Sequence, residues 1–429
     1  MITFCATGDA LIHIAPPATY DGVVELSERI QTADVRITNL ETTISQYDCY
    51  ASSFSGGTPL TAHPDRLNDI KAYGFNVIGC ANNHALDFSF GGVLSTMKHL
   101  NAAALPFAGI GESLAQASAP ATVQTADGNV AVFAQTAVYS GNDSGRAGES
   151  HDGILPRPGV NGLRHIDECV VTREQMDYLK QLAYDTMVNA EDELDSAFGY
   201  GGADDGTFSF GSVKFRVGDQ TGKTSRCHPK DIERTECAIR QALVDHRYAV
   251  ALIHSHQFPR RTEHEVDYYV EEFAHRAIDA GAHAVVGGGN HLLKGIEIYK
   301  GRPIFYCLGN FLFHAEYVTR ISADVVDTFG FPQELSGAEV VARRKARAVN
   351  PMENNEIFYR SVIPFWTMDG DTLTSVKLLP IELGRTAGEG LRGFPRVAKP
   401  EDIFDHLQTV CQPYGTTLRI NGDYIEVAL

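Results

Sequence analysis

Residues 282–291 read Ala-His-Ala-Val-Val-Gly-Gly-Gly-Asn-His, an apolar run that ends in three glycines and two polar side chains. Short apolar runs rich in β-branched residues are typical of buried strands. The runs before and after it repeat the pattern, because Tyr248–Ile253 leads into His254-Ser255-His256 and Pro303–Leu308 leads into Gly309-Asn310. Each run is therefore predicted to be a buried strand whose end carries chemically active groups.

The same pattern occurs in the first part of the chain. Three more apolar runs end in polar clusters: Ile2–Ala6 before Gly8-Asp9, Val35–Thr38 before Asn39-Leu40-Glu41, and Phe75–Cys80 before Asn82-Asn83-His84. Helices are predicted at Pro64–Tyr73, Gly92–Ala104, Lys230–Arg247 and Val266–Ala280. Alternating strands and helices indicate a layered α/β domain, in which ligands bind at the carboxyl ends of the strands. The polar clusters are therefore expected to meet in one active site.

The remaining segments are less informative. Asn129–Val138 is predicted to be a strand, residues 139–161 a long loop over the site, and residues 191–206 an exposed acidic insertion. The C-terminal elements are expected to be two strands in Phe358–Leu383, a helix at Pro400–Gln412 and a hairpin in Thr417–Leu429 that turns at Asn421-Gly422. The basic run at 343–347 is interpreted as a solvated helix face, with an anion site as the alternative.

The composition limits the class of protein. The 429 residues include 36 Lys and Arg against 54 Asp and Glu, which gives a formal net charge of −18. Such an acidic chain is not expected to bind nucleic acid or an anionic membrane surface broadly. No apolar run approaches the ~20 residues that span a bilayer. The N-terminus lacks the basic region of a signal peptide, so a cytoplasmic location is expected. The eight cysteines include no Cys-x-x-Cys pair, which disfavours a zinc finger or a disulfide framework.

The residues that can carry chemistry are carboxylates, an amide and imidazoles. They are Asp9, Glu41, Asn83, His84, His254, His256 and His291. Such groups bind borderline divalent metals, and they are equally the groups of metal-free acid–base catalysis. The residues alone therefore leave both chemistries open. Asp87, one helical turn after His84, is placed either to support that imidazole or to stabilise a helix N-terminus.

Several of these motifs resemble one known family. Similarity to the CapA, or poly-γ-glutamate capsule synthesis (PGA_cap), family is carried by Gly8-Asp9, Asn39-Leu40-Glu41, Ala81–Asp87, Arg157–Asn161 and Gly287–Phe311. The resemblance implies a calcineurin-like metallophosphoesterase fold, which is a four-layer α/β/β/α sandwich, here with a C-terminal β-hairpin extension. Residues 1–325 are then expected to form the catalytic domain. Residues 326–429 are expected to complete the second sheet or to form a small appendage.

One departure from the family pattern affects the expected metal site. The family usually has Gly-His-Gly-Pro-His or Gly-His-His-Pro-His where this chain has Gly287-Gly288-Gly289-Asn290-His291. The upstream imidazole is absent, and His256 is the candidate that would replace it. A small branch of the family contains a metal-independent epimerase that inverts the C-terminal Trp of a lasso-peptide precursor. The chain resembles that branch in its length, its expected cytosolic location and its weakened metal set.

Three functional hypotheses follow. The first, implied by the resemblance, is a metal-independent Cα epimerase of a ribosomally made, lasso-type peptide, which needs no cofactor. Its catalytic residues would be Asp9, Asn83, His84 and His291, with Asp9 and His291 as an opposed acid–base pair, and its substrate-binding residues would be Glu41, Arg157, His254, His256 and Asn310. The second is a metal-dependent hydrolase or transferase acting on amide or phosphoester bonds, including those of poly-γ-glutamate. It would hold Mn, Zn or Mg through Asp9, Glu41, Asn83, His254 and His291. The third is a binding protein whose catalytic centre has decayed.

Overall fold

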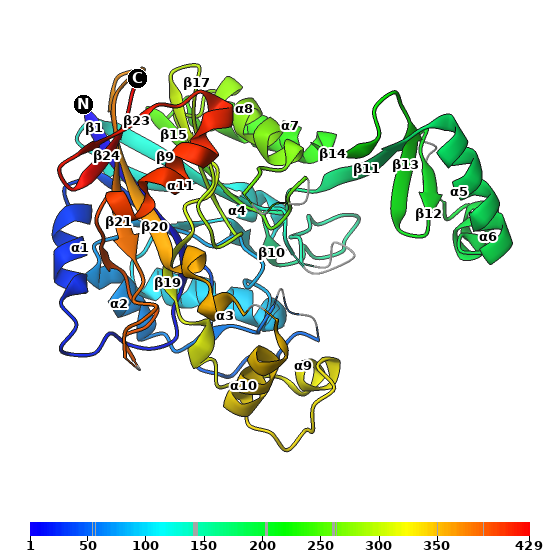
Figure 1. Ribbon diagram of the computed structural model, residues 1–429, viewed down its shortest axis with the longest axis horizontal. Coiled ribbons are helices and arrows are strands. Elements are labelled where there is room, and N and C mark those ends of the chain that lie inside the picture. The colour runs from blue at the N-terminus through cyan, green and yellow to red at the C-terminus, as the bar shows by residue number, and fades with distance from the viewer. Residues whose placement is uncertain are drawn as a thin grey trace.

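The computed structural model of the chain describes residues 1–429 except residues 54, 56, 140–144, 202–204, 260, 261, 263, 350 and 389. It confirms the predicted α/β class, because helices and several mixed sheets are interspersed along the chain. Two large sheets lie face to face, and helices cover their outer faces (Figure 1). None of the helices in the described part of the chain combines the length and the apolarity that a bilayer crossing requires.

The larger sheet is centred on β1 (Ile2–Leu11). Its strand order is β23-β24-β21-β20-β1-β2-β5-β6, while β19 also pairs with β1 and β22 with β21. The bounds of these strands are β2 Val35–Leu40, β5 Val77–Gly79, β6 Phe107–Ala108, β19 Asn310–Phe313, β20 Arg360–Asp369, β21 Thr372–Glu382, β22 Arg396–Val397, β23 Leu418–Asn421 and β24 Tyr424–Val427. Because β1, β2 and β5 run parallel, their carboxyl ends lie at one edge, with Asp9 opposite Asn39.

The smaller sheet has the strand order β17-β18-β16-β15-β9-β8. Its strands are β8 Ala121–Thr125, β9 Gly128–Thr136, β15 Tyr248–His254, β16 Ala284–Gly288, β17 Ile296–Tyr299 and β18 Arg302–Phe305. The strands β9, β15, β16 and β18 run parallel, and His254 lies opposite Gly288 at their carboxyl ends. One prediction needs correction here. Asn310 does not lie at the end of the strand predicted in 303–308; it is the first residue of β19, which belongs to the larger sheet.

An apolar core joins the two sheets. The rings of Phe4 and Trp366 stack there with centroids 5.1 Å apart, and both side chains are completely buried. Helices α1, α2 and α3 cover the outer face of the larger sheet, and α7 and α8 cover that of the smaller sheet. Their bounds are α1 Gly22–Ile30, α2 Arg66–Ala72, α3 Ser89–Ala102, α7 Pro229–Ala242 and α8 Tyr268–Asp279. All but α1 correspond to predicted helices.

The C-terminal segment returns to the larger sheet. β20 runs antiparallel to β1, β21 follows through the predicted hairpin, and β23 and β24 form the predicted hairpin at the sheet edge. Helix α11 (Glu401–Cys411) packs Leu407 and Cys411 into the core between the sheets. The domain boundary at residue 325 stays a prediction, and strands from both sides of it share this sheet.

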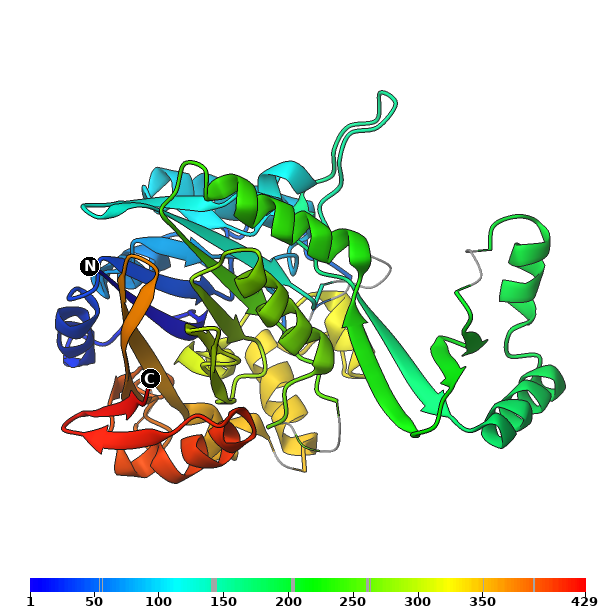
Figure 2. The ribbon, with the colours of Figure 1, turned by 90° about the horizontal axis from the view of Figure 1, so that it is seen from above.

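A projecting arm is formed by the part of the chain between β9 and β15. It consists of β11 His165–Val171, α5 Arg173–Thr186, α6 Ala190–Ala197, β12 Phe208–Phe210, β13 Val213–Val217 and β14 Gly222–Cys227. Figures 1 and 2 show this arm extending away from the two sheets. Residues 191–201 are exposed, as predicted, but they lie largely in α6. The strands around them were not among the predicted elements.

Two smaller segments complete the fold. Between β19 and β20 lies a helical appendage made of α9 (Ala323–Thr328) and α10 (Gly337–Arg347), and the basic run belongs to α10. In the predicted loop over the site, residues 140–144 lie outside the described residues. The part that follows is a narrow hairpin, bridged between Gly148 and Arg157, which projects from the body in Figure 2.

The approach of β1 to the turn before β19 requires glycine at position 8. A Cβ atom on Gly8 would overlap the carbonyl oxygen of Gly309. Gly8→Ala is therefore expected to lower the free energy of unfolding by about 1–3 kcal/mol, because the backbone must shift to relieve the overlap. Urea unfolding followed by circular dichroism measures this loss. Gly388→Ala is the control, since no described atom lies within 4 Å of its Cβ position. An equal loss in both variants would contradict the prediction.

Candidate functional site

The polar ends of strands from both sheets meet in one place, which we call the strand-end cluster. It comprises Asp9, Glu41, Asn83, His84, His254, His256 and His291. His254 links the two carboxylates, with Nδ1 3.6 Å from Asp9 Oδ1 and Nε2 3.5 Å from Glu41 Oε1. His291 Nδ1 lies 3.7 Å from Asp9 Oδ2 and 3.8 Å from Glu41 Oε2. The structure therefore brings the predicted strand-end residues together.

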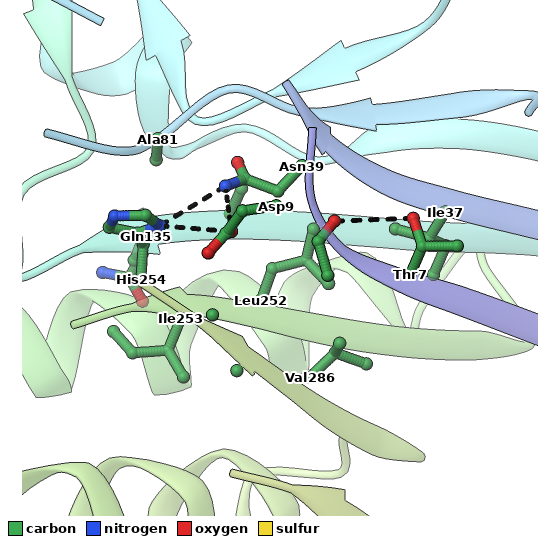
Figure 3. Close-up of a pocket in the computed structure, with 14 residues that line it drawn as sticks. Thr7, Asp9, Ile37, Asn39, Ala81, Gln135, Leu252, Ile253, His254 and Val286 are labelled. Carbon is green, nitrogen blue, oxygen red and sulfur yellow. Dashed lines mark hydrogen bonds and ion pairs between the residues drawn. The ribbon is translucent and has the colours of Figure 1, made fainter. Parts of the chain in front are cut away.

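Asp9 is a fixed and ionised carboxylate. Its Oδ1 accepts a hydrogen bond from Asn39 Nδ2 at 2.7 Å, and its Oδ2 accepts one from the backbone N–H of Gly289 at 2.8 Å. Figure 3 shows Asp9, Asn39 and His254 turned toward one another. Although burial alone would raise the pKa of Asp9, the hydrogen bonds and charge of His254 and its neighbours lower it to about 2. Asn39 was not among the predicted site residues, although its place two residues before Glu41 in a strand-end motif is a signal for it.

Glu41 is a buried carboxylate without a hydrogen-bond donor. Its side chain is completely buried, and neither Oε1 nor Oε2 has a hydrogen-bond partner among the described residues. Burial raises the pKa of Glu41 well above its usual range, and the charges of Asp9 and Asp87 raise it further. A carboxylate in such a place is costly unless it takes up a proton or a cation. Glu41 is therefore the group whose surroundings are least complete.

His254 has a fixed orientation because both ring nitrogens have polar neighbours. Nε2 lies 2.7 Å from Asn83 Oδ1, and Nδ1 lies 3.3 Å from Asn39 Nδ2. The imidazole is also 2% exposed, so water does not compete for these contacts. Asn83 thus connects the end of β5 in the larger sheet with the end of β15 in the smaller one.

His291 is held by backbone conformation and by Asn310. Its φ of 60° lies in the left-handed region, which is uncommon for a residue other than glycine. Its Nδ1 lies 2.9 Å from Asn310 Oδ1, while Asn310 Nδ2 donates to the carbonyl oxygen of Phe358 at 3.0 Å. Asn310 is completely buried and hydrogen-bonded to His291, which is the geometry of a residue that positions this imidazole, while its substrate-binding role stays a prediction. Burial lowers the pKa of His291 to about 4, against the opposing effect of Asp9.

His84 forms a pair with Asp87. The two groups are 2.6 Å apart, from Nδ1 to Oδ2. Asp87 is itself fixed, because it accepts hydrogen bonds from Ser55 Oγ at 2.8 Å and from the backbone N–H of Leu60 at 2.7 Å. The other ring nitrogen of His84 lies 4.0 Å from Glu41 Oε1. Asp87 therefore has the geometry of a group that supports the His84 imidazole.

Gly288 marks the position where the expected imidazole is absent. A Cβ atom on this residue would point into the cluster, 2.6 Å from Asp9 Oδ1. His256 brings an imidazole to the cluster from beyond the end of β15, and its Nε2 is buried without a hydrogen-bond partner in the described part of the chain. Burial lowers the pKa of His256 well below its usual range. The cluster thus lacks one histidine and contains another at a neighbouring strand end.

Two overlapping sets of side chains have ligand atoms close enough to hold a divalent cation. Among the described residues these sets are Asp9, Glu41 and His254, and Glu41, His256 and His291. Within each set the ligand atoms lie within 4.8 Å of one another. Mixed carboxylate and imidazole donors suit zinc, manganese or iron. The unpartnered oxygens of Glu41, which belongs to both sets, fit such a cation.

A large cavity opens above the cluster. Its volume is about 750 Å³, and Asn83, His84, His256 and His291 line its floor. A much smaller cavity of about 20 Å³, drawn in Figure 3, lies between the sheets beside Asp9 and His254. A ligand in the large cavity therefore meets the histidines first.

The other predicted substrate-binding residues lie in three different places. His256 lines the large cavity. Glu41 and His254 are buried behind it, because they belong to the layer where the strands end. Arg157 lies on the projecting hairpin, where its Nη2 donates to the carbonyl oxygen of Arg146 at 2.9 Å, and it does not line the cavity. The loop over the site that was expected around Arg157 is thus not seen among the described residues.

The chain is similar in sequence to a known protein family and to several known proteins. The chain matches the family model described as bacterial capsule synthesis protein PGA_cap over residues 3–315. It is 31% identical to an uncharacterised protein of Sinorhizobium fredii over 97% of this chain and 91% of that protein. It is 25% identical to a probable polyglutamine synthesis accessory protein of Mycobacterium tuberculosis, over 65% of this chain and 55% of that protein.

A crystal structure of a hypothetical protein from Thermus thermophilus is similar over 89% of this chain and 99% of that chain. The TM-score of 0.40 and the identity of 10% are too low to support an argument about fold or function. The family assignment therefore depends on the sequence matches. By its match over most of its length, the chain belongs to the bacterial capsule synthesis protein family PGA_cap.

Proposed function

We propose that the protein is a divalent-metal-dependent hydrolase or transferase that acts on amide or phosphoester bonds. The observation that carries this proposal is Glu41, a completely buried carboxylate that lacks a described donor and belongs to both candidate ligand sets. A cation is one of the two partners, beside a proton, that can compensate such a carboxylate, and the surrounding imidazoles are placed as further ligands. The calcineurin-like metallophosphoesterase type of sandwich, with a catalytic domain over residues 1–325, is part of the same proposal.

We assign the ligands of two cations to the two sets described above, with His256 in place of the imidazole absent at position 288. Bound divalent cations supply a nucleophile by lowering the pKa of water, and they polarise the bond under attack. Asn39 and Asn310 keep the ligands oriented, because each hydrogen-bonds a carboxylate or an imidazole of the cluster. Asn83 acts through His254, to which it is hydrogen-bonded.

His84 is the group that we assign to proton transfer. It lines the large cavity, and Asp87 holds its Nδ1 so that the other nitrogen faces the cluster. An imidazole oriented in this way can protonate the leaving group as the bond breaks. The buried Asp87 carboxylate fixes the orientation of the ring, because its Oδ2 lies 2.6 Å from Nδ1.

The relatives support a role in polymer synthesis. The family is described as bacterial capsule synthesis protein, and the mycobacterial relative is named a probable polyglutamine synthesis accessory protein. We extend to this chain an accessory role of the same kind, in which it cleaves or transfers amide-linked material. A peptide-like substrate is consistent with the volume of the cavity above the cluster, which is in the range of small-ligand sites.

A metal-independent peptide epimerase is the second candidate. Gly288 favours it, because the metal ligand expected there is missing. The proposed acid–base pair does not favour it, since Asp9 Oδ2 and His291 Nδ1 are only 3.7 Å apart. Inversion by two bases needs groups on opposite faces of one carbon, and Asp9 does not line the large cavity. The metal-dependent reaction is therefore the better supported of the two.

The first test of the proposal is metal binding. Metal-free protein titrated with Mn²⁺ or Zn²⁺ in a calorimeter should bind the ion, and Glu41→Gln should weaken binding by at least about tenfold, because both ligand sets lose their shared carboxylate. Glu168→Gln is the control, since Glu168 is a buried carboxylate of the arm that is 8% exposed and lies outside the cluster. Equal binding by wild type and Glu41→Gln would contradict the assignment.

A second test addresses the proton donor. His84→Gln should lower kcat on any accepted substrate by roughly 10²–10⁴-fold, which is the usual contribution of a general acid. Its metal affinity should stay close to that of the wild type, because His84 belongs to neither ligand set. Steady-state kinetics and the same titration measure the two quantities. A variant that loses metal and activity together would show that His84 is a ligand.

The third test separates the two candidate functions. The protein is incubated in D₂O with poly-γ-glutamate, bis(p-nitrophenyl) phosphate or a peptide that ends in an aromatic residue, with and without EDTA. Metal-dependent cleavage predicts shortened products that disappear with EDTA and return with Mn²⁺ or Zn²⁺. Mass spectrometry follows the products. Deuterium entering an intact peptide in the presence of EDTA would sink the proposal and favour the epimerase.

A further inference from the structure

The cavity above the strand-end cluster has a wall that the reaction itself does not use. This wall comes from the α9–α10 appendage, from the segments that flank it and from Phe258, which follows β15. The residues that line it include Phe258, Phe313, Phe329, Phe331, Phe358, Met352 and Pro351, together with Arg344, Lys345 and Arg347. The wall therefore combines an apolar part with a basic part.

The apolar part begins at the cluster. The ring of Phe313 lies 5.9 Å from that of His291, and Phe313 also packs against Tyr359 at 5.4 Å. Phe313 is buried, whereas Phe258 in the same wall is 42% exposed, so an apolar group of a ligand gains free energy chiefly by removing water from Phe258. An apolar group seated here would lie directly beside the histidines on the floor of the cavity.

The basic part, which we call the basic face, comes from the last turn of α10, where Arg344, Lys345 and Arg347 line the cavity. Arg347 is held in place, because its guanidinium lies 3.9 Å from the centroid of Phe331 and its Nη1 donates to the carbonyl oxygen of Phe329 at 2.6 Å. Lys345 Nζ lies 3.7 Å from Glu316 Oε2, which anchors the helix to the chain after β19. The helix itself begins in a capping box formed by Ser336 and Glu339. These contacts make the basic face a fixed part of the wall.

The charge of this cavity is opposite to that of the whole chain. The formal net charge is −18, yet the described residues that line the cavity include three cationic side chains and neither aspartate nor glutamate. A concave surface of one charge attracts ligands of the opposite charge. The two carboxylates of the cluster lie beneath the floor and are completely buried.

We propose that the cavity recognises a substrate that carries a carboxylate or phosphate next to an apolar group. The anionic group binds at Arg344, Lys345 and Arg347, the apolar group lies on the phenylalanine wall, and the reacting bond lies over the histidines. This inference rests on the proposed function, whose substrate class it narrows. A chain of glutamates alone would satisfy the basic face but would place no apolar group against the phenylalanine wall.

The test measures binding to the full chain by calorimetry, with Mn²⁺ and after chelation. The probes are N-acetyl-Leu-Phe with a free carboxylate, its C-terminal amide, 2-phenylethyl phosphate and tri-glutamate. The two probes that combine an apolar group with an anion are expected to bind about tenfold more tightly than the amide and tri-glutamate, since hydrogen bonds to charged groups are the stronger ones. The tighter of these two probes identifies the anion as carboxylate or phosphate.

Variants of α10 assign the effect to the basic face. Arg344→Gln combined with Arg347→Gln should weaken binding of the anionic apolar probes about tenfold and leave the amide unchanged. Arg343→Gln is the matched control, because Arg343 is an exposed residue of the same helix that does not line the cavity. Should the double variant fold poorly, Lys345→Gln is a second variant in which binding of the anionic apolar probes is measured.

Two results would overturn the inference: tri-glutamate binding as tightly as the anionic apolar probes, or Arg343→Gln weakening binding as much as the double variant. The chelated samples test the recognition of the probes by the cavity separately from the proposed metal-dependent function. A probe preference that persists without any metal binding would support the cavity and refute the metal centre. Metal binding without a probe preference would support the metal centre and refute the proposed recognition by the cavity.

Discussion

Two carboxylates, Asp9 and Glu41, lie completely buried where strands of both sheets end, and the site is organised around that burial. Removing a carboxylate from water is costly unless donors or cations replace the water. Asp9 receives hydrogen bonds from Asn39 and Gly289, and His254 beside it lowers its pKa against the effect of burial. Glu41 receives none among the described residues, and imidazole nitrogens at 3.5–4.0 Å are its polar neighbours. This arrangement requires the strand ends of both sheets to lie close together. Even a Cβ atom on Gly8 would push β1 away from the turn before β19.

The strand ends could be predicted because a buried strand of a parallel sheet is a contiguous apolar run, and its end is a local change in polarity. Asn310 could not be placed in the same way. The chain stays apolar from Pro303 to Phe313 apart from Gly309 and Asn310, so nothing local shows that it leaves one sheet and enters the other between β18 and β19. Gly309, with a φ of 72°, is the single residue that marks this turn. The arm was missed for a different reason: its strands are short and partly exposed on both faces, so the alternation that identifies a half-buried strand is weak.

The basic run shows the limit of local patterns for function. Arg343 and Arg344 are adjacent and chemically identical, yet only Arg344 lines the cavity. A helix that projects from a domain and carries several charges is usually solvated. Nothing within residues 337–347 shows that some of its side chains line a cavity near the end of β16. That relation depends on where β19 and β20 place the appendage. Arg157 is the converse case, because it belongs to a family-like motif and yet lies on a hairpin that does not reach the cavity.

In the proposed metal centre, the imidazole of His256 takes the place of one at position 288, and the two positions differ in location. His254 and Gly288 are paired across β15 and β16, so an imidazole supplied by His256 instead of residue 288 enters from the neighbouring strand, about 4.8 Å away. Gly288 borders the small cavity between the sheets, whereas His256 lines the large one. The imidazole of His256 therefore lies on the side of the large cavity, whereas position 288 lies on the side of the interior. Asp9, Glu41 and His254 form a set that is buried throughout, while the set with His256 and His291 is only partly buried. A cation in the first set would be shielded from water and exchange slowly. A cation in the second would be held by Glu41, His256 and His291 and would lie beside the large cavity, which the two histidines line.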